Sequence, residues 1–204
     1  GYGGWTAAAA LFGGLEVLLE VFIPMLMSVI VDGGLYREED FMLRGLFPDA
    51  LVAQRDRFVL SKGHAAPCYY AVLAERGFIS RGEFQNFRQL HSILQGHPDC
   101  KKVPGVDAST GSLGQGCSIA VGMALGAKVQ KQDVNVYTIL GDGECQEGQI
   151  WEALMSAAHY KLDNLTVIID NNGLQIDGSN NEVMSLGDLA AKVRAFGFEG
   201  FELD

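Results

Sequence analysis

Two apolar, β-rich runs with one helical stretch between them constrain the fold of this chain most. Residues 134–140 (VNVYTIL) and 165–170 (LTVIID) predict strands, and residues 149–160 predict a helix. A strand, a helix and a strand at this spacing favour a right-handed βαβ unit in a parallel sheet. The other predicted helices span residues 68–76, 81–90, 113–129 and 184–196. We therefore expect an α/β fold, a parallel sheet with helices on both faces.

A Gly-Asp-Gly turn at residues 141–143 follows the first of these runs. Ligands of open α/β sheets bind outside the carboxyl ends of the strands, and Asp142 offers a hard oxygen ligand for Mg²⁺ or Ca²⁺. Asn172 follows the next strand after about 30 residues, the length of a βαβ crossover, so both strand ends should lie side by side. A lone Gly-Asp-Gly is more often a simple turn, but the paired strand end favours a metal–diphosphate site.

Charge and cysteine content narrow the function and the location. The net charge of −10 gives no electrostatic support for nucleic-acid binding. The four cysteines show neither zinc spacing nor Cys-x-x-Cys pairing, which favours isolated thiols in a reducing compartment. No charged-then-apolar leader is evident, so we expect a cytoplasmic protein.

Five strings of residues resemble the transketolase family. They are RDRFVLSKGHAA from residue 55, QGHPD from 95, STGSLGQG from 109, GDGECQEGQIWEALMSAAHYKLDNL from 141 and NNGLQIDG from 171. The resemblance runs from residue 54 to residue 204 and implies a thiamine diphosphate-binding fold. It is similar to the amino-terminal domain of these enzymes, or to the amino-terminal subunit of a split transketolase. We expect the domain to be incomplete.

The resemblance implies a role for each matching residue on the metal and diphosphate side. Asp142 and Asn172 would bind Mg²⁺ (or Ca²⁺) through their side chains, and Leu174 through its carbonyl. Gly143 would offer its amide to the diphosphate, and Asn172 would also contact the cofactor. His64 would face the diphosphate and the substrate channel.

The resemblance also implies roles on the substrate side. His97, in Gly-His-Pro, would hydrogen-bond the donor's hydroxyl near the reacting carbon. Ile176 would pack on the thiazolium ring, and Glu147 would couple the two cofactor sites near a dimer interface. Three more residues would lie along the cofactor's pyrimidine: Gly111, Ser112 and Leu113. Because His64 and His97 lie in loop motifs rather than periodic segments, the residues themselves also favour a site role for both.

A stripe of small residues marks the predicted helix over residues 113–129. Gly114, Ser118, Gly122 and Gly126 recur every four residues, which would let another helix approach closely. That helix belongs either to the same domain or to a second copy across a dimer, and the family resemblance favours the dimer.

Residues 1–53 do not match the transketolase pattern. They include an apolar stretch at residues 7–31 that is long enough to cross a bilayer but contains Glu16 and Glu20. Residues 15–35 resemble the first membrane helix of an ABC-type exporter, and the alternative is a buried helix of this domain. Attachment to a membrane through residues 7–31 therefore remains open. We expect two parts, a non-matching segment at 1–53 and a cofactor domain at 54–204.

The resemblance implies transfer of a two-carbon ketol unit between sugar phosphates. In this family a glutamate on a separate pyrimidine-binding domain activates the cofactor, and no such domain is present in this sequence. We therefore expect a partner, the carboxy-terminal transketolase subunit, in a dimer of such pairs, and no activity from this chain alone. The alternatives are another thiamine-dependent synthase, an inactive fragment or fusion remnant, and a non-catalytic binding module.

Overall fold

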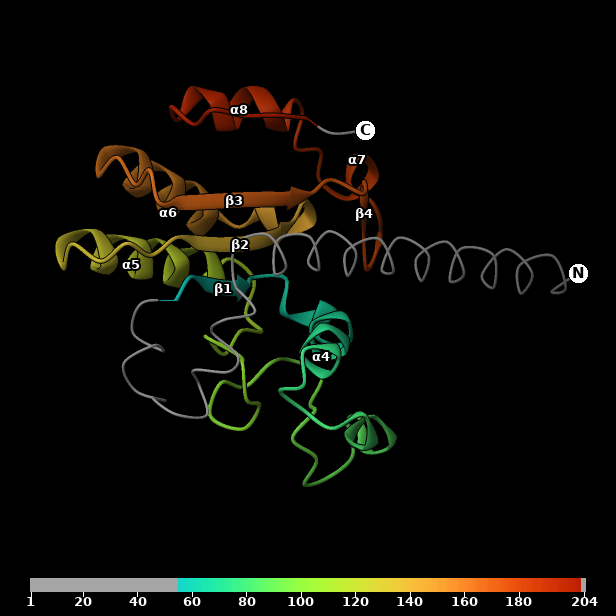
Figure 1. Ribbon diagram of the computed structural model, residues 1–204. Helices are drawn as coiled ribbons and strands as arrows, with labels where there is room; N and C mark the ends of the chain where they lie inside the picture. Colours follow the sequence, from blue (N-terminus) through green and yellow to red (C-terminus); the bar gives the residue numbers. More distant parts are fainter. Residues whose placement is uncertain (1–54, 203–204) are drawn as a thin grey trace, which may run out of the picture.

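The computed structural model describes residues 55–202 of the chain, and its centre is a three-stranded parallel sheet (Figure 1). The strands are β1 (Arg57–Leu60), β2 (Val136–Gly141) and β3 (Leu165–Asp170), in the order β1-β2-β3. Both pairings are parallel, and Gly141 stands opposite Asp170 at the end of the second pair. The βαβ unit predicted from the sequence is therefore present.

Side chains alternate between the two faces of the sheet, and each face has its own core. Phe58 and Ile139 pack with helix α4 (Ala66–Glu75), which contributes the fully buried Tyr70. Val59 and Leu140 point the other way and pack against two longer helices, α5 (Gln115–Val129) and α6 (Gly148–His159). The expectation of helices on both faces of a parallel sheet is confirmed.

Two of the predicted helices differ from the structure. Residues 81–90 form only a short 3-10 helix, η3 (Arg81–Asn86), because the backbone then turns through positive φ at Arg88 (60°) and His91 (69°). A left-handed residue cannot continue a right-handed helix, and neither position carries the glycine that would have signalled the turn.

The predicted helix over residues 184–196 is replaced by two short helices, α7 (Asn180–Val183) and α8 (Leu189–Ala195). Each begins at its own cap, because Ser179 accepts from the amide of Glu182 and Asp188 accepts from that of Ala191. A small hairpin of β4 (Leu174–Gln175) and β5 (Gly178–Ser179) precedes them and was not predicted.

Three loops leave the sheet at the same edge, because parallel strands end on the same side. The arrows point one way in Figure 1, and the β4–β5 hairpin lies beyond the head of β3. Short 3-10 turns, η2 (Gly63–Ala65) and η4 (Gly143–Gln146), follow β1 and β2. This edge therefore gathers most of the residues that the sequence singled out.

Within residues 55–202, no helix has the length and apolar character needed to cross a membrane. The predictions for residues 7–31 and 15–35, and the boundary at residue 53, lie outside the described residues.

Candidate functional site

One buried carboxylate joins the loops that follow β2 and β3. Asp142 is 1% exposed; its Oδ1 accepts from the amide of Gly143 at 2.7 Å, and its Oδ2 accepts from the amide of Gly173 at 2.6 Å. The structure thus brings Asp142 beside the loop that carries Asn172, as the crossover length predicts. Asn172 is exposed, and its Oδ1 accepts from the amide of Leu174 at 2.9 Å.

The donor set at this edge suits a hard divalent cation. Asp142 offers a carboxylate, Asn172 an amide oxygen and Leu174 a main-chain carbonyl, which are the ligand types that Mg²⁺ and Ca²⁺ prefer. No group of three or more His, Cys, Asp or Glu side chains that could hold a metal ion occurs among the described residues. A cation here would therefore depend on these few oxygens and on oxygens of the ligand.

Gly143 is held in a close approach that only glycine permits. A Cβ at this position would lie 3.2 Å from Cβ of Gln175 and 3.4 Å from Oδ1 of Asn180. The β4–β5 hairpin thus packs directly against the Gly-Asp-Gly turn. In this structure the amide of Gly143 is bonded to Asp142, so contact with a diphosphate would require that bond to be shared or exchanged.

Glu144 is a second buried carboxylate, and the sequence analysis missed it. It is 2% exposed, and Oε1 accepts from the hydroxyl of Ser61 at 2.5 Å and from the amide of Gly114 at 2.8 Å. Its Oε2 accepts from the amide of Gly141 at 3.1 Å. Glu144 therefore links the end of β1, the start of α5 and the end of β2. Its place directly after the Gly-Asp-Gly turn was the available signal.

A buried ion pair crosses the same edge. Nζ of Lys62 lies 2.7 Å from Oδ2 of Asp170, with the two side chains 7% and 22% exposed. The pair joins the loop after β1 to the last residue of β3, across the end of β2. Burial raises the cost of leaving either charge alone, so the two loops are held in register. Lys62 was not predicted as a site residue.

Three more loops meet where His97 lies. A Cβ at Gly111 would lie 3.4 Å from Cγ of His97, so the imidazole lies against that glycine. A Cβ at Gly63 would lie 2.9 Å from Oγ1 of Thr110 and 3.0 Å from the amide of Gly111. The hydroxyl of Thr110 donates to the carbonyl of Leu60 at 2.7 Å. The loop before His64, the Gly111 loop and His97 are thus brought together.

An open pocket of about 600 Å³ adjoins His97. It is lined by Arg88, Gln95, Gly96, His97, Pro98, Asp99, Lys101 and Ser109. The volume suits a small organic ligand. His64 and His97 are both exposed, while Pro98 beside His97 is buried and anchors the loop.

The remaining predicted residues lie at the surface of the same region. Glu147 precedes α6 and is exposed, and a Cβ at Gly114 would lie 3.3 Å from its Cβ. Ile176, at the tip of the β4–β5 hairpin, is fully exposed, and so is much of Leu113. Ser112 is exposed as well. These side chains are therefore open to a ligand or to a second protein.

The stripe of small residues on α5 divides into two halves. Gly114 lies beside Glu147 and Gln149, and Ser118 accepts a hydrogen bond from Nε2 of Gln149 at 2.8 Å, so this half packs against α6. A Cβ at Gly122 or Gly126 would meet nothing within 4 Å among the described residues. Packing within the domain therefore accounts for the first half, and the dimer remains a prediction for the second.

Comparison with known proteins identifies the relatives of this chain. The family described as "Transketolase, thiamine diphosphate binding domain" matches residues 44–203. One of the two named subunits of apulose-4-phosphate transketolase from Phocaeicola vulgatus is 48% identical over 151 residues, which are 74% of this chain and 53% of that protein. Human transketolase is 54% identical over 120 residues, which are 58% of this chain and 19% of that enzyme.

Solved structures agree with these relatives. Transketolase from Campylobacter jejuni has a TM-score of 0.68 at 39% identity and covers 72% of this chain and 24% of its own. Transketolase from Leishmania mexicana has a TM-score of 0.71 at 34% identity and covers 85% of this chain and 26% of its own. The chain spans about half the length of the curated transketolase subunits that it matches.

Proposed function

This chain belongs to the transketolase family through its thiamine diphosphate-binding domain, and we propose that it supplies this domain to a two-subunit transketolase. The complex would transfer a two-carbon ketol unit between sugar phosphates. One observation carries the proposal: the loops after all three strands converge on Asp142 and Glu144, in a chain that is 48% identical to a transketolase subunit. The free state of all four cysteines suits a reducing compartment such as the cytoplasm.

The strand-end loops would hold the cation and the diphosphate. Asp142, the side chain of Asn172 and the carbonyl of Leu174 are the proposed ligands of Mg²⁺ or Ca²⁺. Gly143 would present its amide to the diphosphate, and His64 would face it from the loop after β1. The absence of a Cβ at Gly143 supports this role, because a side chain would collide with the β4–β5 hairpin.

The loop residues would meet the organic part of the cofactor and the sugar. Thiamine diphosphate, when bound, supplies the carbanion chemistry that breaks and remakes the carbon–carbon bond. His97 would donate to or accept from the donor's hydroxyl, which agrees with its exposed ring beside the pocket. Ile176 would give apolar contact to the thiazolium ring. The pyrimidine side would be lined by Gly111, Ser112 and Leu113.

The partner would be a subunit with the pyrimidine-binding domain and its activating glutamate. Three relatives are named as subunits of a transketolase rather than as whole enzymes, which supports a division of the enzyme between two chains. Glu147 is exposed beside the start of α5, which suits a role at an interface between two such pairs. A dimer of pairs is therefore part of the proposal.

Reconstitution with a pyrimidine-domain subunit tests this function. Ketol transfer from a ketose phosphate to an aldose phosphate should be absent with either subunit alone, because neither holds the whole cofactor, and should appear on mixing with Mg²⁺ and thiamine diphosphate. The control is the same mixture with Asp142→Ala. Turnover by this chain alone, free of host enzyme, would refute the need for a partner, and no turnover by any mixture would favour an inactive fragment.

A further inference from the structure

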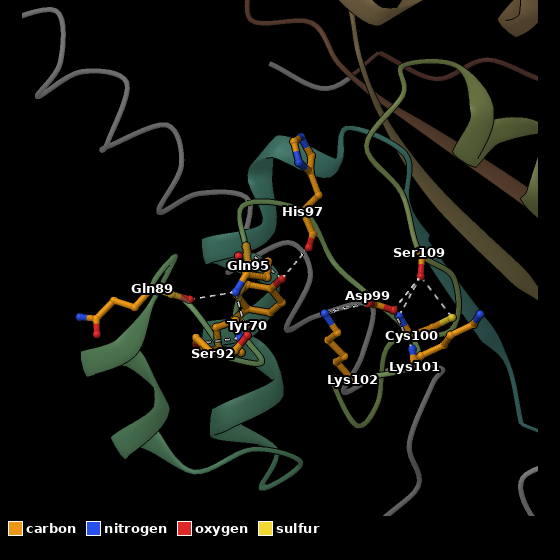
Figure 2. A network of polar contacts seen from close by, with 11 residues as sticks. Tyr70, Gln89, Ser92, Gln95, His97, Asp99, Cys100, Lys101, Lys102 and Ser109 are labelled. Carbon is orange, nitrogen blue, oxygen red and sulfur yellow. Dashed lines mark hydrogen bonds and ion pairs between the residues drawn. The ribbon is translucent and has the colours of Figure 1, made fainter.

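The loop that presents His97 rests on one buried tyrosine of α4. Figure 2 shows the hydroxyl of Tyr70 directed at the main chain of this loop, while the ring of His97 points away from Tyr70. The hydroxyl donates to the carbonyls of Gln95 and His97, each at 3.0 Å. A phenol has one proton, so the two carbonyls share it. Together these contacts fix the carbonyl directions on both sides of Gly96.

Gly96 would otherwise be the weak point of the loop, since glycine has the largest choice of backbone angles. The guanidinium of Arg88 covers its other side, because a Cβ at Gly96 would lie 2.9 Å from Nε and Nη2 of Arg88. The side-chain amide of Gln95 donates to the carbonyls of Ser92 at 2.7 Å and Gln89 at 3.1 Å. The loop is thus held from Tyr70 on one side and from the η3 segment on the other.

Tyr70 suits a permanent anchor. Its side chain is fully buried, and its ring meets that of Phe87 edge-on at 6.3 Å between centroids. Burial raises the pKa of Tyr70 to about 12, so the hydroxyl keeps its proton at any physiological pH. The contact that it makes to the loop is therefore constant, and the direction of the His97 ring follows from it.

We propose that Tyr70 is a positioning residue for the substrate side of the site: by holding the carbonyls of Gln95 and His97, it aims the imidazole of His97 along Gly111. This inference rests on the proposed function, in which His97 contacts the sugar donor. It assigns a task to a residue that touches neither the cofactor nor the substrate.

The neighbouring tyrosine offers a matched control. Tyr69 lies on the same helix, is also buried, and its hydroxyl also donates to a main-chain carbonyl, that of Gly105 at 3.1 Å. Tyr70→Phe and Tyr69→Phe each remove one hydroxyl without leaving a cavity for a side chain. Only the first removes a contact to the loop of His97.

The experiment is a double-mutant cycle on the complex reconstituted with the pyrimidine-domain subunit. Tyr70→Phe should lower kcat/KM for a ketose phosphate roughly 5- to 20-fold, the usual effect of losing one hydrogen bond that fixes a reacting group, and leave the Kd for thiamine diphosphate unchanged. Tyr69→Phe should change neither. In a His97→Ala background, Tyr70→Phe should cost less than about twofold, because the group that it positions is gone.

The outcomes separate this inference from the proposed function. If His97→Ala slows the reaction but Tyr70→Phe does not, the inference is wrong and the function of His97 stands. A full loss from Tyr70→Phe in the His97→Ala background would also overturn it, since the effect would not pass through His97. If His97→Ala itself costs nothing, the role of His97 fails and the inference fails with it.

Discussion

The site has two halves that are built differently. In the strand-end half, Asp142 and Glu144 are 1% and 2% exposed, and together they accept hydrogen bonds from three loops. In the loop half, His64 and His97 are exposed and depend on main-chain contacts below them. A buried carboxylate is costly to leave unpaired, whereas an exposed imidazole can be removed at little cost to folding. Substitutions should therefore affect stability and cofactor binding in the first half, and the reaction rate in the second.

The largest stability effect is expected at Glu144. Glu144→Gln replaces one acceptor oxygen with a donor, which must face the amide of Gly141 or the pair formed by Ser61 and Gly114. The free energy of unfolding should fall by about 2 to 4 kcal/mol, because buried donors lose their acceptor. Urea unfolding of the chain measures this. Glu152→Gln, on the exposed side of α6, is the control and should stay within about 0.5 kcal/mol.

An equal loss in the two variants would contradict the comparison between the halves, because Glu144 would then carry no more than a surface residue.

The loop half should respond in rate. His97→Ala in the reconstituted complex should lower kcat/KM for ketose donors by roughly tenfold to a few hundredfold, the cost of about 1 to 3 kcal/mol for a hydrogen bond to a substrate hydroxyl. Its affinity for thiamine diphosphate should be nearly unchanged. His64→Ala should instead weaken cofactor binding. His159→Ala, on the exposed side of α6, is the control for both.

The reverse pattern, with cofactor lost in His97→Ala and only donor specificity lost in His64→Ala, would mean that the two assignments are exchanged. No difference from His159→Ala in either variant would leave only the metal site.

The smallest effect concerns the thiols under the strand-end half. Burial, with a further contribution from Glu144, raises the pKa of both Cys117 and Cys145 to about 12. The folded state therefore favours the protonated thiols, and their contribution to stability is complete below about pH 9 and is lost as the pH rises toward 12. Below about pH 9, titration with a thiol reagent should find one fast cysteine, the exposed Cys100, and the other three only on unfolding.

Fast modification of two or more cysteines in the native chain would show that the buried half is looser than the structure indicates.

The difference between the halves also explains what sequence reasoning could find. The strands and the pairing of Asp142 with the Asn172 loop were predictable, because a repeating apolar pattern and a crossover length determine them. The roles of Glu144, Lys62 and Tyr70 were not, because each depends on a contact between residues far apart in the chain: Ser61 and Glu144 are 83 positions apart and Lys62 and Asp170 are 108 apart.

Local signals failed where an unusual backbone replaced the usual residue. The helix predicted over residues 81–90 ends early because Arg88 and His91 adopt positive φ without glycine. The caps at Ser179 and Asp188 were visible in the sequence, and giving them weight would have divided the helix predicted over residues 184–196. The assignments taken from the family resemblance to individual cofactor contacts remain predictions.

Calorimetric titration of the reconstituted complex with thiamine diphosphate, with and without Mg²⁺, tests the central claim most directly. Wild type should bind the cofactor in a Mg²⁺-dependent manner. Asp142→Ala should abolish that binding, and Asp142→Asn should weaken it greatly, because the cation bridges this side chain and the diphosphate. Asp163→Ala, an exposed aspartate that precedes β3 at the opposite edge of the sheet, should bind like wild type. Affinity and Mg²⁺ dependence unchanged in a folded Asp142→Ala complex would contradict the assignment of the strand-end half as the metal and diphosphate site.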